Sequence, residues 1–146
     1  MAETKPKKKK LRGLPKIIWG FFAPLNDNDY FQKKFEDTDV KILLNAKDGR
    51  YAALIKINNG KIEIDGVPNK DKKELKKKKL GWDGKLETTT QIFMDIAMNK
   101  ISLWGIIGKI FTRKIKIRGI RKLLILLKVF DILAYEEKKA NEAKNE

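Results

Sequence analysis

Three short segments in the first half of the chain alternate apolar and polar residues, and this pattern constrains the fold most strongly. Alternation with a period of two is typical of strands that bury one face. The connections contain Asp-Gly and Asn-Gly, which tolerate the positive φ angles of tight hairpins. The pattern therefore predicts a three-stranded antiparallel meander with one covered face, formed by residues 40–46, 50–57 and 61–67.

The same reading predicts two further strands and four helices. A helix over 26–38 precedes the meander, with Asn26 or Asn28 as its cap. After the meander come a strand over 80–88, a helix that begins at Thr89 or Thr90, a helix capped by Ser102, a strand over 112–118 and a last helix after Gly119. The predicted fold class is α+β, with a five-stranded, mostly antiparallel sheet covered by helices.

The last helix is apolar on nearly all sides. At 100° per residue, one wide face carries Leu123, Leu126, Leu127, Phe130, Leu133 and Ala134. The opposite stripe holds Arg121, Lys128, Asp131 and Tyr135, and also Ile125 and Ile132. Such a helix is either buried on several sides or covers something apolar that is not protein. It is too short and too charged to span a bilayer.

Composition excludes several classes of function. The 146 residues suffice for one domain with tails. The sequence has no Cys and no His, which removes thiol nucleophiles, thiolate metal sites and the commonest general base. Its aspartates are scattered through turns and loops. We therefore expect a protein that is not an enzyme, without catalytic residues, a metal or a cofactor.

The charge points to an anionic partner. Lys and Arg number 34 against 19 Asp and Glu, a formal net charge of +15, which attracts nucleic acid, acidic proteins or anionic lipid surfaces. The basic arm at 1–16 is expected to be disordered in isolation. The apolar segment that follows, at 17–25, either straps onto the domain or enters a membrane surface. The lysine-rich segment at 70–79 is either a solvated loop or a second anionic contact.

These segments give three regions. Residues 1–25 form a basic, partly disordered arm with an apolar strap, and residues 26–135 form the domain. Residues 136–146 are a polar tail of mixed charge that is expected to fray.

Several short motifs, in order, resemble one known family. Lys114-Ile115-Lys116-Ile117-Arg118-Gly119 is similar to that family's strand before its C-terminal helix, and Met94-Asp95-Ile96-Ala97-Met98-Asn99-Lys100 to its helix end. Weaker matches are Ala46-Lys47-Asp48-Gly49 and Ile57-Asn58-Asn59-Gly60 at the meander turns. Over residues 30–133 the chain thus resembles the sterol carrier protein domain family, the nonspecific lipid-transfer fold.

The resemblance implies an apolar tunnel for acyl chains or sterols, bordered by the C-terminal helix, and no catalytic residues. The positions that would form its wall are Phe93, Ile96, Ala97, Trp104, Ile107, Ile110, Leu123, Leu124, Leu127 and Phe130. A tunnel wall and an ordinary core have the same composition, so the residues leave open whether the tunnel is filled by side chains.

The leading hypothesis is noncatalytic binding and transfer of a fatty acyl, isoprenoid or sterol-like lipid at anionic membranes. The residues expected at head groups or the membrane are Lys7, Lys8, Lys9, Lys10, Trp19, Arg118, Arg121 and Lys122. Arg121 and Lys122 replace the family's small, polar helix start and leave a preference for sterols open. We expect a cytoplasmic monomer that associates peripherally with membranes.

Two alternatives remain from the residues. A membrane- or protein-docking module with a collapsed pocket would show the same apolar faces. A basic nucleic-acid-binding domain agrees with the net charge, but the exposed strand faces lack the alternating aromatic and basic residues of a stacking platform.

Overall fold

The computed structural model describes residues 11–98, 100, 105, 108–109 and 112–144. Five strands form one sheet in the order β3-β2-β1-β4-β5. Three neighbouring pairs are antiparallel, and β1 with β4 is parallel. The predicted α+β fold with a mostly antiparallel five-stranded sheet is confirmed. The strands are β1 (Asp39–Ala46), β2 (Tyr51–Asn58), β3 (Lys61–Pro68), β4 (Gly84–Thr88) and β5 (Lys116–Arg118).

The predicted meander forms β1, β2 and β3. The Asn-Gly turn between β2 and β3 has positive φ at both residues, 51° at Asn59 and 76° at Gly60. The Asp-Gly turn between β1 and β2 differs from the expectation, because neither Asp48 nor Gly49 has a positive φ. The register sets Ile42 opposite Ile55, and Ile55 opposite Ile64, so apolar side chains gather on one face.

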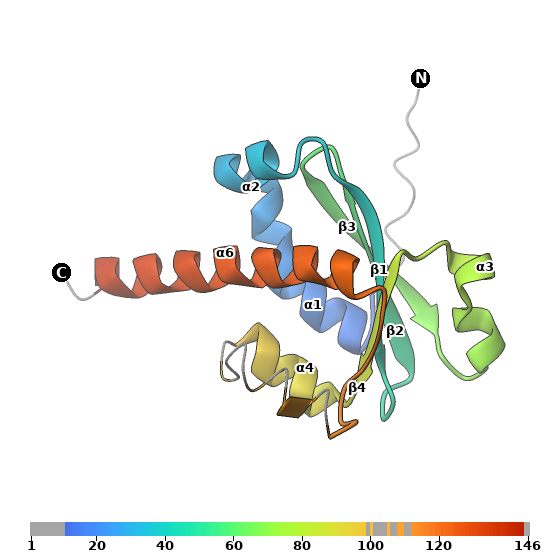
Figure 1. The fold of residues 1–146 in the computed structure, drawn as a ribbon. Helices are drawn as coiled ribbons and strands as arrows, with labels where there is room; N and C mark the ends of the chain where they lie inside the picture. The colour runs from blue at the N-terminus through green and yellow to red at the C-terminus, as the bar shows by residue number, and fades with distance from the viewer. Residues whose placement is uncertain (1–10, 99, 101–104, 106–107, 110–111, 145–146) are drawn as a thin grey trace.

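Helices cover that apolar face, and a short helical segment covers part of the other (Figure 1). The first group comprises α1 (Leu14–Phe22), the 3-10 helix η1 (Ala23–Asp27), α2 (Asp29–Lys34), α4 (Thr90–Ala97) and α6 (Ile120–Lys144). The second comprises the 3-10 helix η2 (Lys72–Leu75) and α3 (Lys77–Leu80). We call the sheet face beside η2 and α3 the outer face.

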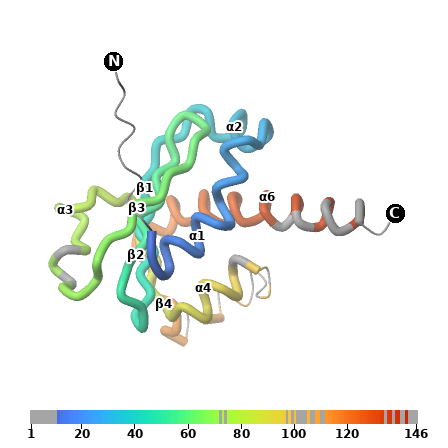
Figure 2. The backbone as a smooth tube through the Cα atoms, turned by 180° about the vertical axis from the view of Figure 1, so that it is seen from behind, coloured from blue at the N-terminus to red at the C-terminus, as the bar shows by residue number. Residues whose placement is uncertain are grey.

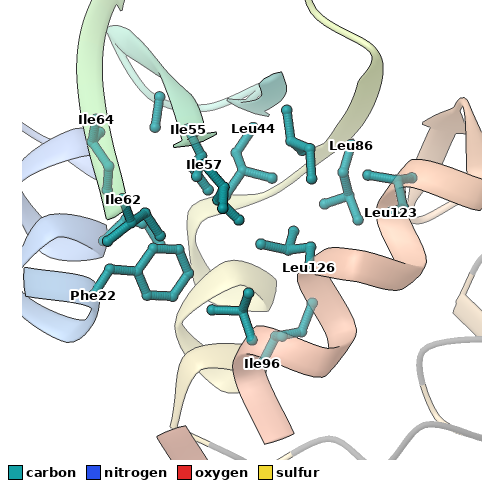
Figure 3. Close-up of a cluster of buried hydrophobic side chains, with 14 of the residues drawn as sticks. Phe22, Leu44, Ile55, Ile57, Ile62, Ile64, Leu86, Ile96, Leu123 and Leu126 are labelled. Atoms are coloured by element: carbon teal, nitrogen blue, oxygen red, sulfur yellow. The ribbon is translucent and has the colours of Figure 1, made fainter. Parts of the chain in front are cut away.

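The main core lies between the sheet and the first group of helices. Figure 3 shows Phe22, Ile96 and Leu126 meeting from three helices beneath the strand residues Leu44 and Ile57. A smaller apolar cluster on the outer face packs the η2–α3 segment against β1 and β2; its buried members are Leu43, Ala52, Leu54 and Leu75. Both faces of the central strands are therefore covered, so the prediction of one covered face is wrong for them, because Leu43, Ala52 and Leu54 are apolar as well and pack under the η2–α3 segment.

Four boundaries differ from the expectations. The helix expected over 26–38 is the shorter α2, which begins after its cap Asn28 and ends at Lys34. The segment expected as a strap is part of helix α1, because Leu14, Ile18 and Phe22 recur every fourth residue and are buried. The fourth strand begins only at Gly84, because Gly81 adopts a left-handed φ of 67° and ends helix α3. The fifth is confined to the three residues of β5.

Helix α6 is longer than expected, and a different side of it faces the core. It continues to Lys144, through the tail that was expected to fray, and it extends away from the sheet (Figures 1 and 2). Ile132, expected on the outward stripe, is buried, and so is Val129. The buried stripe Leu123, Leu126, Val129 and Ile132 recurs every third residue, which turns the inward face toward Ile132 and leaves Leu124 half exposed.

The side-chain amide of Asn26 pairs with the free edge of β3. Its Oδ1 accepts from the backbone N–H of Ile62 at 2.8 Å, and its Nδ2 donates to the Ile62 carbonyl at 2.9 Å. Replacing Asn26 by alanine leaves two buried backbone groups without partners and is expected to cost about 1–3 kcal/mol of unfolding free energy, measured by urea denaturation. Asn26→Asp retains the acceptor but places a carboxylate oxygen against the Ile62 carbonyl, so it should recover little of this loss. Equal stability of the alanine variant and the original protein would contradict the bridge.

Candidate functional site

Helix α4 is positioned by its N-terminus. Thr89 Oγ1 accepts from the backbone N–H of Ile92 at 3.3 Å. Asp48, in the turn after β1, accepts from the backbone N–H of Thr90 at 2.8 Å and from its hydroxyl at 3.0 Å. The backbone hydrogen bond from Thr90 is the main cause that holds the pKa of Asp48 below its ordinary value. The predicted cap thus joins α4 to the meander.

The start of α6 is positioned by a close backbone approach. Gly119 has a φ of 66° and lies against Asp83 and Gly84, so a side chain there would collide with the backbone. Thr88, which is fully buried, donates its hydroxyl to the carbonyl of Lys114 at 2.7 Å. These contacts hold the chain before α6 against the edge of β4.

Some of the predicted wall residues meet in one apolar layer. Phe93 and Ile96 from α4 and Leu123 from α6 are buried in the main core. Leu127 and Phe130 are partly buried and pack against it.

The other predicted wall residues do not join this layer or cannot be placed. Leu124 is 51% exposed and points away from the core, because it lies 100° around the helix from Leu123. Trp104, Ile107, Ile110 and the side chain of Ala97 lie outside the described residues.

The layer also contains residues that the wall prediction omitted. The ring of Phe22 lies 5.5 Å from that of Phe130, centroid to centroid, and connects α1 to α6. Val129 and Ile132 complete the inward face of α6. The spacing of Leu14, Ile18 and Phe22 is a helical signal already present in the sequence.

The predicted basic and interfacial residues separate onto different surfaces. Trp19 is partly buried and packs against the main core. Arg121 and Lys122 are exposed at the start of α6, whereas Arg118 lines a cavity with β4 residues. Lys7, Lys8, Lys9 and Lys10 lie outside the described residues. Within the described part of the chain, none of the helices combines the length and hydropathy that crossing a bilayer requires.

Two adjoining cavities lie on the outer face, of about 220 Å³ and about 290 Å³. Both are lined by Leu75, Glu87 and Lys116, so η2, β4 and β5 contribute to each. The first is completed by Lys85, Ile117 and Arg118, and the second by Asn45, Lys47 and Asn69. Most of the residues that line these cavities are polar or charged, so the lining differs from that of the predicted apolar tunnel, which stays a prediction.

A chain of polar side chains forms the floor of these cavities. Asn69 Nδ2 donates to Asn45 Oδ1 at 3.0 Å, and Asn45 Nδ2 donates to Glu87 Oε2 at 3.0 Å. Lys85 Nζ lies 3.6 Å from the same carboxylate oxygen. Burial raises the pKa of Glu87, but the hydrogen bond from Asn45 and the charge of Lys85 outweigh it and hold this pKa below its ordinary value. Glu87 is therefore ionised at neutral pH.

Comparison with known proteins identifies the fold. No protein-family model and no curated protein sequence matches this chain. A solved structure described as "UbiJ-SCP2 Ubiquinone synthesis protein" is similar with a TM-score of 0.57 at 10% identity, over 86% of this chain and 98% of its own. A double mutant of the sec-alkyl sulfatase PisA1 is similar with a TM-score of 0.54 at 18% identity, over 75% of this chain and 15% of its own.

At these identities the similarity concerns the fold alone. The predicted resemblance to the sterol carrier protein domain is confirmed at this level, since the first similar structure carries that domain designation and is covered almost completely. In the sulfatase, the same fold corresponds to a small part of a longer chain.

Proposed function

We propose that this protein binds and carries a hydrophobic ligand without catalysing a reaction, as a monomer at anionic membranes. The observation that carries the proposal is a sterol carrier protein-like fold over 86% of the chain. The structurally similar protein is named for ubiquinone synthesis, and ubiquinone is itself a lipid with an isoprenoid chain. The ligand classes that we propose are fatty acyl, isoprenoid and sterol-like lipids.

The apolar layer between α4 and α6 supports this proposal. Phe93 and Ile96 from α4 and Leu123 from α6 belong to one buried apolar cluster. Among the described residues, no charged side chain is buried. Burying an acyl chain gains about 0.8 kcal/mol per methylene, so a long chain would bind well without any polar recognition. Entry of the ligand would require α6 or α4 to move from its packed position.

Binding can be tested by titrating the protein with a fluorescent long-chain fatty acid. Phe130→Trp adds volume on the inward side of α6 and is expected to weaken binding. Leu124→Trp adds similar bulk to the same helix on its exposed side and is the matched control. The proposal predicts saturable uptake that Phe130→Trp reduces and Leu124→Trp leaves unchanged. Absence of uptake by the folded original protein would contradict it.

The exposed side of α6 supports the membrane part of the proposal. Ile120 is 59% exposed and Leu124 51% exposed, one helical turn apart. Arg121 and Lys128 are exposed on the same helix. Apolar side chains flanked by basic ones are typical of helices that lie at the surface of anionic bilayers.

Membrane docking can be tested by flotation with vesicles that contain phosphatidylserine. The double variant Ile120→Ser, Leu124→Ser is expected to reduce the partition coefficient about tenfold, because it removes two side chains that would enter the interface. Tyr30→Ser removes another exposed ring, which is 60% exposed on α2, and should have little effect. An equal reduction in both variants would contradict docking through α6.

A further inference from the structure

The outer face of the sheet concentrates basic residues from separate segments. Lys47 follows β1, Lys85 lies on β4, and Lys116 and Arg118 lie on β5, yet all four line the two adjoining cavities. Among the described residues that line these cavities, the one carboxylate is Glu87. Four cations against one carboxylate leave a net charge of +3 around a concave surface.

Within the part of the chain that the structure describes, three of the four cations have no carboxylate at ion-pair distance. Among the described residues, the ion pairs join Lys56 to Asp65 and Lys85 to Glu87. Lys47, Lys116 and Arg118 make no such pair within the described ranges. The charge of Lys116 lowers the pKa of Glu87, but from beyond ion-pair distance. Unpaired cations around a cleft focus positive potential into it and attract anions.

Glu87 cancels only part of this field, and its carboxylate is held in place by other groups. Its Oε2 accepts from Asn45 Nδ2 and lies 3.6 Å from Lys85 Nζ. Asn69 holds Asn45 in place from the other side, through a hydrogen bond to Oδ1 and another to the carbonyl of Ala46. The cleft therefore has a hydrogen-bonded floor, with the exposed side chains of Lys116 and Arg118 at one wall.

We propose that this cleft is a binding site for a phosphoryl group, separate from the hydrophobic ligand. Arg118 offers the fork of donors that matches phosphate oxygens, and Lys116 and Lys47 add point charges. The sheet lies between this cleft and the helix-covered core, so occupation of one does not require the other. The phosphoryl group belongs either to a small phosphate ester or to a phospholipid head group.

The site can be tested with the full chain by NMR titration of backbone amides at constant ionic strength. Glycerol phosphate is the soluble probe, and vesicles containing phosphatidic acid are the lipid probe. We expect saturable shifts at Lys47, Glu87 and Lys116 with at least one probe. Saturation by glycerol phosphate identifies a small phosphate ester, and a response to vesicles alone identifies a lipid head group. Failure of both probes to saturate these amides would overturn the site.

Three variants separate a built site from general attraction. Lys116→Gln with Arg118→Gln should weaken binding at least about tenfold, since both charges adjoin the cleft. Lys138→Gln with Lys139→Gln removes the same charge from exposed positions near the end of α6 and should weaken it far less. Glu87→Gln keeps a hydrogen-bond acceptor but removes the one negative charge, so it should strengthen binding about threefold or more.

Two results would contradict the proposal directly. Equal weakening by the two double variants would show that net charge alone attracts phosphate. If folded Glu87→Gln bound the phosphoryl probe more weakly, the carboxylate would be helping to bind the probe rather than opposing it. Because fatty acid uptake is measured separately on the same variants, loss of the phosphoryl site can be distinguished from loss of the hydrophobic site.

Discussion

Replacing Phe22 by alanine is expected to lower the free energy of unfolding by about 3–5 kcal/mol. Phe22 is fully buried, and its ring packs on Phe130 across the boundary between α1 and α6. Truncation removes that contact and leaves a cavity that close-packed neighbours cannot fill without strain. Urea denaturation measures the effect.

Phe21→Ala is the matched control for this substitution. It removes the same atoms one residue earlier on α1, where the ring is only partly buried against the core. Its expected loss is smaller, in proportion to the area buried. Similar losses in the two variants would mean that α1 does not pack on α6 through Phe22.

Replacing Gly119 by alanine is expected to destabilise the protein by about 2–5 kcal/mol. The residue has a φ of 66°, and an added Cβ would collide with the Asp83 carbonyl oxygen and lie 3.1 Å from the Cα of Gly84. Both contacts are with backbone, so relief requires the start of α6 to shift from the sheet. A lower Tm and altered amide shifts along α6 should accompany the loss.

Gly20→Ala is the matched control: it makes the same chemical change but is expected to raise the stability of the protein. Gly20 lies inside α1, with no atom within 4 Å of an added Cβ. Alanine there should raise stability by about 0.5–1 kcal/mol, because it restricts the unfolded chain and favours the helix. If Gly119→Ala were as stable as Gly20→Ala, the result would contradict the close contact between Gly119 and the backbone of Asp83 and Gly84.

The strands could be predicted because their signals are local. Alternation and the Asn-Gly turn depend on neighbouring residues, and Asn59 and Gly60 adopt the expected positive φ angles. The order of elements then led to a resemblance that the fold confirms. Short motifs were sufficient because their order and spacing follow the order of the helices and strands along the chain.

The orientation of α6 could not be predicted in the same way. Apolar residues occur on nearly every side of this helix, so periodicity did not select one inward face, and Ile132 was placed outward although it is buried. Its length was underestimated because the polar residues after Tyr135 resemble a fraying end, whereas Asn28 donates to Glu136 at 3.2 Å and connects this part of α6 to the domain.

The outer cleft was also beyond sequence reasoning. Lys47, Lys85 and Arg118 are separated by tens of residues and converge only because β4 pairs with both β1 and β5. Each is an ordinary surface cation when taken alone. The hydrogen bonds that fix Glu87 likewise join residues that are far apart along the chain.

Native mass spectrometry of the purified protein, followed by organic extraction, tests the central claim most directly. The proposed function predicts a stoichiometric lipid that is lost on delipidation and restored by adding the extracted lipid. The extract would identify the ligand as acyl, isoprenoid or sterol-like. A folded protein that carries no lipid after purification and takes up no fluorescent fatty acid would contradict the carrier function, and the apolar layer would then be a closed core in a docking module.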